Sequence, residues 1–130
     1  MGFDLLGASE RLFEQTLDYL KSREQFGVLI GTFQALQHRG AHWYAELATT
    51  RALLWRPLED VAGDAPDAAA KIKASAVGIS SGNKAIQMHG GIGMTDEVQV
   101  GWGLRRARVG QMSFGDERYH RERFAALLGI

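Results

Sequence analysis

The chain of 130 residues contains no cysteine, only two prolines and no excess of either charge. Without cysteine it has no disulfide, thiolate nucleophile or cysteine-based metal centre, and it suits a reducing compartment. Its 15 basic and 15 acidic residues create no net field that would attract nucleic acid or an anionic membrane. No apolar run approaches the ~18 to 20 residues that span a bilayer. We therefore expect a soluble intracellular protein, cytoplasmic or in another reducing compartment, without a nucleic-acid partner or a membrane span.

Residues that favour helices dominate the long segments, whereas β-branched runs are scarce. Apolar positions recur with helical spacing over residues 4–24 and 32–62, and Thr32 is the expected N-cap of the second helix. After a turn around Pro66, residues 63–90 are rich in alanine and glycine. Because small side chains let neighbouring helices approach closely, we expect this third helix to be the most buried.

Two further helices are predicted in the last third of the chain. Thr95 is expected to cap a short helix that continues to about Arg105, and a last helix begins near Asp116. The pattern therefore predicts an all-α fold, an antiparallel four-helix bundle with an extra short helix, as one domain over residues 1–130.

Two clusters of polar residues are typical of an ordinary solvated surface. His38 and His42 are four residues apart, but the run lacks the Glu beside the first His that a zincin requires. We therefore expect surface histidines and no metal site. The three arginines of the RRAR run also favour a solvated face over a phosphate site: Arg105, Arg106 and Arg108.

The stretch SREQFG, residues 22–27, closes the first predicted helix and has two interpretations. In the structural one, Arg23 faces the helix dipole, Phe26 packs into the core and Gly27 caps the helix. In the functional one, Arg23 reaches a phosphate and Phe26 packs on a flat ring. Spacing does not choose between them, and physics alone favours the structural interpretation.

The stretch MHGGIGMTDE, residues 88–97, places three glycines within four positions. A helix end followed by a new helix start explains Gly90, Gly91 and Gly93 without any ligand. Two helix ends that meet at glycines also suit an anion. No strand precedes this run, so it is not a dinucleotide-binding fingerprint.

Three stretches, in this order, resemble the C-terminal helical domain of the acyl-CoA dehydrogenase family. They are YLKSREQFGVLIGTFQALQH (19–38), NKAIQMHGGIGMTDE (83–97) and LRRARVGQMSFGDERYHRERFA (104–125). The match covers nearly the whole chain at the family's own spacing. It implies a helical bundle, which the apolar periodicity predicts independently.

The resemblance implies an FAD site shared between two subunits. Arg23 would pair with the pyrophosphate, Phe26 would pack near the cofactor, and the backbone at two glycines would make room for it. The resemblance implies that one subunit contributes Arg23, Gln25, Phe26 and Gln34. Its neighbour would contribute Gln87, Gly90 and Gly91. Such a site exists only in an oligomer.

The chain departs from the family's pattern at the catalytic base. Many members carry that Glu in a Tyr-Glu-Gly-Thr motif, but this chain has SFGD, with Phe114 at the place of the Glu. Asp116 stands at the place of the Thr and is a weak candidate for the base, although an Asp that opens a helix favours an N-cap. It is also a candidate to contact the flavin ribityl chain. Glu10 and Glu14 look like ordinary face residues of the first helix.

The family's N-terminal helical domain and middle β-domain are absent from these 130 residues, so we expect the isolated chain to be inactive. The resemblance implies that an acyl-CoA thioester is the substrate of the whole enzyme. It also implies an electron-transferring flavoprotein as acceptor and a homo-oligomer or a mixed tetramer. The loss of the Glu leaves an alternative open, a non-catalytic assembly subunit that retains part of the cofactor site.

Overall fold

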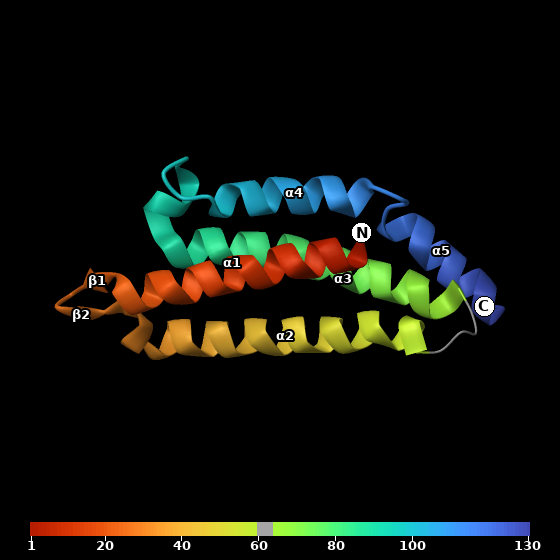
Figure 1. Cartoon of the computed structure of the whole chain (residues 1–130), viewed down its shortest axis with the longest axis horizontal. Coiled ribbons are helices and arrows are strands. Elements are labelled where there is room, and N and C mark those ends of the chain that lie inside the picture. The colour runs from red at the N-terminus through yellow and green to blue at the C-terminus, as the bar shows by residue number, and fades with distance from the viewer. Residues whose placement is uncertain (60–63) are drawn as a thin grey trace.

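The computed structural model describes residues 1–59 and 64–130, and these are almost entirely helical. The helices are α1 (Gly2–Ser22), α2 (Gln34–Glu59), α3 (Asp64–His89), α4 (Val100–Met112) and α5 (Glu117–Leu128). The first four run side by side in alternating directions, and α5 extends from one end of the bundle (Figure 1). The predicted all-α antiparallel bundle is confirmed. Within the described ranges, no helix is both long and apolar enough to cross a membrane.

Helix α3 is the centre of the bundle and contacts each of the other four helices. Its small residues allow this, because a Cβ at Gly82 would lie only 2.8 Å from Leu104 Cα of α4. The prediction that α3 is the most buried helix is confirmed by its buried residues, most of which are small: Ala68, Ala70, Lys71, Ala74, Ser75, Val77, Gly78, Ser81, Gly82, Ala85, Met88 and His89.

Trp43 joins three helices in the middle of the core. Its side chain on α2 is fully buried, and its Nε1 donates to Ser81 Oγ of α3 at 2.8 Å. Phe13 of α1 packs against it edge to face, with ring centroids 5.2 Å apart. A buried indole needs a partner for its N–H, and Ser81 supplies that partner. The pair therefore fixes the lateral position of α2 on α3.

A two-stranded antiparallel hairpin, which the sequence did not predict, lies between α1 and α2. Its strands are β1 (Glu24–Gln25) and β2 (Val28–Leu29). Both residues at the tip have positive φ, 56° at Phe26 and 77° at Gly27, as a type I′ turn requires. The tip holds Phe26 91% exposed, so the expectation that it packs into the core is wrong. Because strand β1 begins at Glu24, α1 ends at Ser22 and not at Glu24 as predicted.

Two predicted N-caps are wrong, because each threonine closes a short 3₁₀ turn. Thr32 lies in η1 (Ile30–Thr32), where its Oγ1 donates to Leu29 O at 2.7 Å, and α2 begins later. Thr95 follows η2 (Gly90–Met94), and its Oγ1 donates to Ile92 O at 2.8 Å. The predicted end of the second helix at residue 62 lies outside the described residues.

Helix α4 starts and ends later than predicted. It begins at Val100, which is 2% exposed, and continues past Arg105 to Met112. Its second half packs closely on α1, since a Cβ at Gly110 would lie 2.6 Å from Leu5 Cδ2. Asp116 then caps α5, as predicted, by accepting a hydrogen bond from Tyr119 N at 2.8 Å.

Candidate functional site

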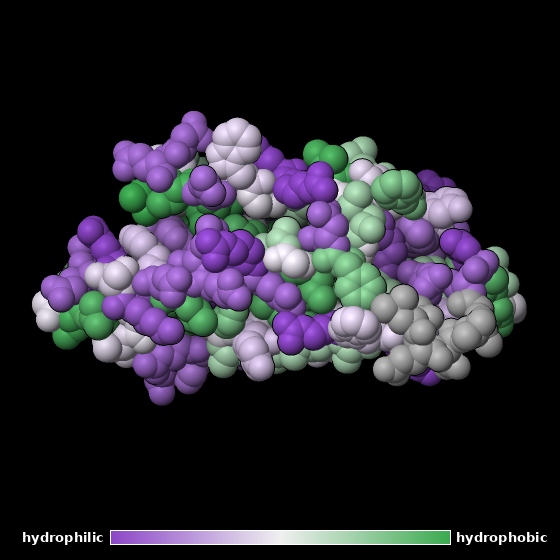
Figure 2. All heavy atoms as spheres, viewed as in Figure 1, coloured by the Kyte–Doolittle hydropathy of each residue, from purple (hydrophilic) through white to green (hydrophobic). Residues whose placement is uncertain are grey.

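The hairpin presents three of the predicted cofactor residues to solvent. Arg23 has an extended backbone that ends α1, and its side chain, like those of Gln25 and Phe26, is exposed. None of the ion pairs within the described residues uses Arg23. At the hairpin end of the molecule, on the left in Figure 2, hydrophobic residues (green) lie among hydrophilic ones (purple). An exposed cation three residues from an exposed aromatic ring offers groups that suit an anion carrying a flat ring system.

Gln34 is the first residue of α2, which follows the hairpin through η1. Its side chain is exposed. Its neighbour Phe33 packs edge to face on Phe26, with ring centroids 6.1 Å apart. This contact joins the hairpin tip to the segment that leads into α2.

The three glycines after α3 have different physical roles. Gly90 has φ of +68°, a conformation that ends the helix. A Cβ at Gly93 would lie 2.6 Å from Ile86 O, so this glycine is required by packing. A Cβ at Gly90 or Gly91 would meet no atom within 4 Å. Gln87 on the last turn of α3 is exposed as well. The backbone at Gly90 and Gly91 is thus open to approach from outside.

A contact between α1 and α3 holds the hairpin and the glycine turn at the same end of the bundle. Tyr19 Oη donates to His89 O at 3.3 Å, and the two rings stack with centroids 4.4 Å apart. His89 is 6% exposed, and its Nδ1 is 2.8 Å from Ala85 O. His89 therefore serves packing. Figure 1 shows both segments, the hairpin and the end of α3, at the same end of the bundle.

Asp116 lies toward the opposite end of the bundle, in the turn between α4 and α5 (Figure 1). The structure thus brings seven of the eight predicted cofactor residues to one end of the helical bundle and separates the eighth, Asp116, from them. Phe114 in the same turn has φ of 59° and is 80% exposed. Two buried polar residues beneath this turn, Lys71 and His120, are not predicted from the sequence, although a lysine in a run of small apolar residues is a usable signal.

The other sequence candidates are surface residues. His38 and His42 are exposed, and the described residues contain no cluster of three metal-binding side chains. Arg106 pairs with Asp4 at 2.8 Å, and Arg105 is 3.9 Å from Asp96. These contacts agree with the predicted solvated face.

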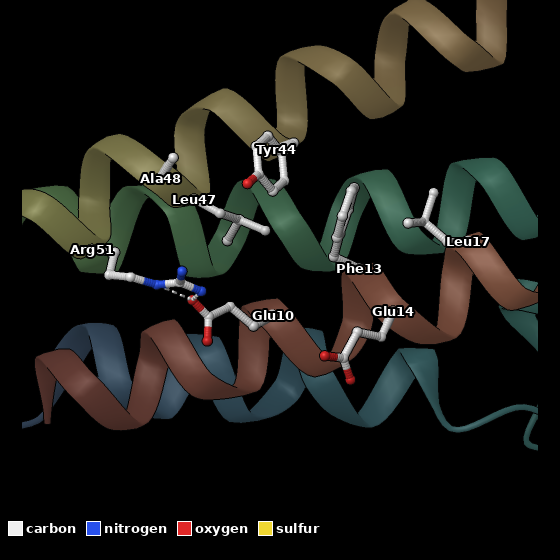
Figure 3. Close-up of a pocket in the computed structure, with 8 residues that line it drawn as sticks. All are labelled: Glu10, Phe13, Glu14, Leu17, Tyr44, Leu47, Ala48 and Arg51. Carbon is white, nitrogen blue, oxygen red and sulfur yellow. Dashed lines mark hydrogen bonds and ion pairs between the residues drawn. The ribbon is translucent and has the colours of Figure 1, made fainter.

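Glu10 and Glu14 lie beside a cavity of about 210 Å³ between α1 and α2 (Figure 3). Arg51 Nε donates to Glu10 Oε1 at 3.1 Å, and Glu14 is 3.5 Å from Arg11. The cavity is lined mainly by apolar side chains: Phe13, Leu17, Tyr44, Leu47 and Ala48. Both carboxylates have cationic partners and so are ordinary face residues of α1.

Comparisons with known proteins agree on one family. A sequence profile described as acyl-CoA dehydrogenase, C-terminal domain, matches residues 1–129. Acyl-CoA dehydrogenase IpdE2 of Mycobacterium tuberculosis is 38% identical over 104 residues, 78% of this chain and 32% of that protein. A solved FAD complex of PigA is 32% identical with a TM-score of 0.87, and the match covers 96% of this chain and 34% of that one.

A third match is the Tcur3481-Tcur3483 steroid ACAD, whose name joins two protein names. It is 31% identical with a TM-score of 0.87, and the match covers 96% of this chain and 36% of that one. The chain spans about a third of the length of the proteins that it matches.

Proposed function

Because the chain belongs to the acyl-CoA dehydrogenase family, we propose that it is the C-terminal domain through which a flavoprotein of this family contacts FAD and assembles. The observation that supports this most is the shared end of the bundle. There an exposed arginine and phenylalanine, at and beside the hairpin, and an open glycine backbone are both free to face a neighbouring subunit, so each half would meet the complementary half of a shared FAD site. The whole protein would oxidise an acyl-CoA thioester between its α and β carbons, with FAD accepting the hydride when bound.

Each residue at this end has a physical role in the proposal. Arg23 offers a permanent cation for the pyrophosphate, and Phe26 offers a flat apolar face to the cofactor. From the neighbouring subunit, Gln87 offers an amide, and Gly90 and Gly91 let the cofactor approach the backbone. The fit rests on the open space at these glycines and on the free exposure of the side chains. Gln25 and Gln34 add exposed amides to the same surface.

A flavin titration of the complete natural protein tests this function. We expect purified protein to carry FAD, and Arg23→Ala to raise the Kd for FAD by about 10- to 100-fold, since a charged hydrogen bond contributes about 1.5–3 kcal/mol. Arg108→Ala is the matched control, because Arg108 is an exposed arginine on α4. Complete protein that is colourless and stays so with added FAD would overturn the proposal.

The acyl-CoA substrate, the acceptor and the assembly are part of the same proposal. The curated relatives, which include acyl-CoA dehydrogenases, support this substrate. The resemblance implies that an electron-transferring flavoprotein takes the electrons, and that the FAD site forms in an oligomer. A homo-oligomer and a mixed tetramer both satisfy that requirement.

Phe114 favours a second candidate, a non-catalytic subunit of a mixed assembly. Phe cannot accept the α-proton, and the similar steroid ACAD has a name that joins two proteins. Asp116 is the remaining acid in the turn, and its carboxylate already caps α5. The test is anaerobic flavin bleaching by octanoyl-CoA in the complete protein and in Asp116→Asn, which keeps the cap. Bleaching that Asp116→Asn abolishes would make Asp116 the base and remove the second candidate.

A further inference from the structure

A buried lysine lies beneath the turn that contains Phe114. The side chain of Lys71, on α3, is 8% exposed. Its Nζ lies within hydrogen-bonding distance of four oxygens: Ser75 Oγ at 3.1 Å and the carbonyls of Gly110 at 3.0 Å, Gln111 at 3.2 Å and Gly115 at 3.3 Å. An ammonium has three donor hydrogens, so these acceptors are sufficient to engage all of them.

Three carbonyl oxygens and one hydroxyl contact this ammonium, and no carboxylate of the described residues lies within ion-pair distance of it. Among the ion pairs of residues 1–59 and 64–130, none includes Lys71. Gly110 and Gln111 belong to the last turn of α4, where carbonyls have no partner within the helix. Lys71 therefore caps α4 from a neighbouring helix, and it reaches beyond the cap to Gly115 in the turn.

Phe114 lies between these two anchor points, Gln111 and Gly115. Its φ of 59° is uncommon for a residue with a side chain and persists only where the surroundings hold it. From α5, His120 Nε2 is 3.0 Å from Phe114 O. The backbone at residue 114 is thus held from α3 and from α5, while its side chain is 80% exposed.

We propose that Lys71 is a positioning residue that fixes the direction of the side chain at position 114. By holding the end of α4 and Gly115 together, it sets the turn that carries this side chain. The importance of that direction rests on the proposed function: the resemblance places Phe114 where many family members carry the base, although Phe itself accepts no proton. The geometry itself concerns the backbone and does not depend on a bound cofactor.

Hydrogen exchange read by mass spectrometry tests the first half of the proposal. In the complete natural protein, Lys71→Met keeps an unbranched apolar stem and removes the ammonium. We expect exchange in residues 109–119 to accelerate at least tenfold, with α1 and α2 unchanged. Lys73→Met is the matched control, because Lys73 lies on the same helix and donates none of the hydrogen bonds found in the described part of the chain. Lys71→Gln, which keeps two donors, replaces Lys71→Met if that variant does not fold.

A fluorine probe tests the second half. Trifluoromethyl-phenylalanine introduced at position 114 should give one sharp ¹⁹F resonance, which shifts and broadens in Lys71→Met and not in Lys73→Met. An unchanged resonance in Lys71→Met, or exchange that rises equally in α1 and α2, would overturn the positioning role. Neither measurement uses FAD, so a protein without flavin would overturn the proposed function and leave this inference standing.

Discussion

Two aromatic residues adopt the left-handed backbone region, where side chains normally clash with the main chain. Phe26 has φ of 56° and Phe114 has φ of 59°, and both side chains are largely exposed. Hydrophobic burial therefore does not hold either of them. At Phe26 the hairpin imposes the conformation, and at Phe114 the contacts from α3 and α5 do so. The two strained positions coincide with the two segments that the resemblance associates with the cofactor and the base.

The burial of Lys71 gives a prediction about pH. Burial lowers the pKa of Lys71 below its ordinary value of 10.5, an effect that the nearby Asp116 charge partly offsets. Between the lowered pKa and 10.5, the unfolded chain binds more protons at this residue than the folded chain. The contribution of Lys71 to the free energy of unfolding therefore rises with pH across that window.

Urea unfolding between pH 8 and pH 10.5 measures this contribution as the difference between the natural protein and Lys71→Met. The natural protein should gain stability relative to Lys71→Met as the pH rises. Lys73→Met, compared in the same way, should show no such gain. Parallel pH profiles for the natural protein and Lys71→Met would contradict the expected burial effect.

At the scale of helices, substituting alanine for Gly7 and for Gly82 should change the stability of the fold in opposite directions. A Cβ at Gly7 of α1 would meet nothing within 4 Å, so Gly7→Ala should stabilise the fold by about 0.5–1 kcal/mol. A Cβ at Gly82 would lie 2.8 Å from Leu104 Cα, so Gly82→Ala should destabilise it by about 1–3 kcal/mol. Urea midpoints of the two variants check both signs. A stable Gly82→Ala variant would show that α3 and α4 need not approach so closely.

At the scale of the whole molecule, the core and the proposed cofactor surface are separate. Trp43 and its neighbours fill the middle of the bundle, whereas the hairpin tip projects from one end (Figure 1). Substitutions at the tip should therefore affect FAD binding and assembly without affecting folding. This separation makes the proposed function testable apart from stability.

Phe26→Ala and Phe13→Ala form the matched pair for this test. Phe26→Ala should change the free energy of unfolding by less than about 0.5 kcal/mol, since the ring is 91% exposed, and should lower FAD content. Phe13→Ala removes a ring packed on Trp43 and should cost about 2 kcal/mol or more. Unfolding curves and the flavin-to-protein absorbance ratio measure the two effects. A large loss of stability in Phe26→Ala would contradict the separation.

Sequence reasoning succeeded where a signal is local. Apolar periodicity predicted the helices, and the position of Asp116 predicted its cap, because both depend on residues within a few positions of each other. Thr32 and Thr95 are good caps in isolation, but Thr32 ends η1 and Thr95 follows η2, so neither begins the next α-helix. The next helix begins where apolar residues such as Val100 pack into the core, and the residues that they pack against lie far away in the sequence.

The sequence by itself determined the helical class, the antiparallel order and the family, because helix periodicity and motif spacing are properties of the chain alone. Only the tertiary structure decided that the hairpin and the glycine turn share one end, through the contact of Tyr19 with His89. Only it showed that Lys71 holds the turn around Phe114. These arrangements join residues tens of positions apart, and the packing of α3 against its neighbours brings them together.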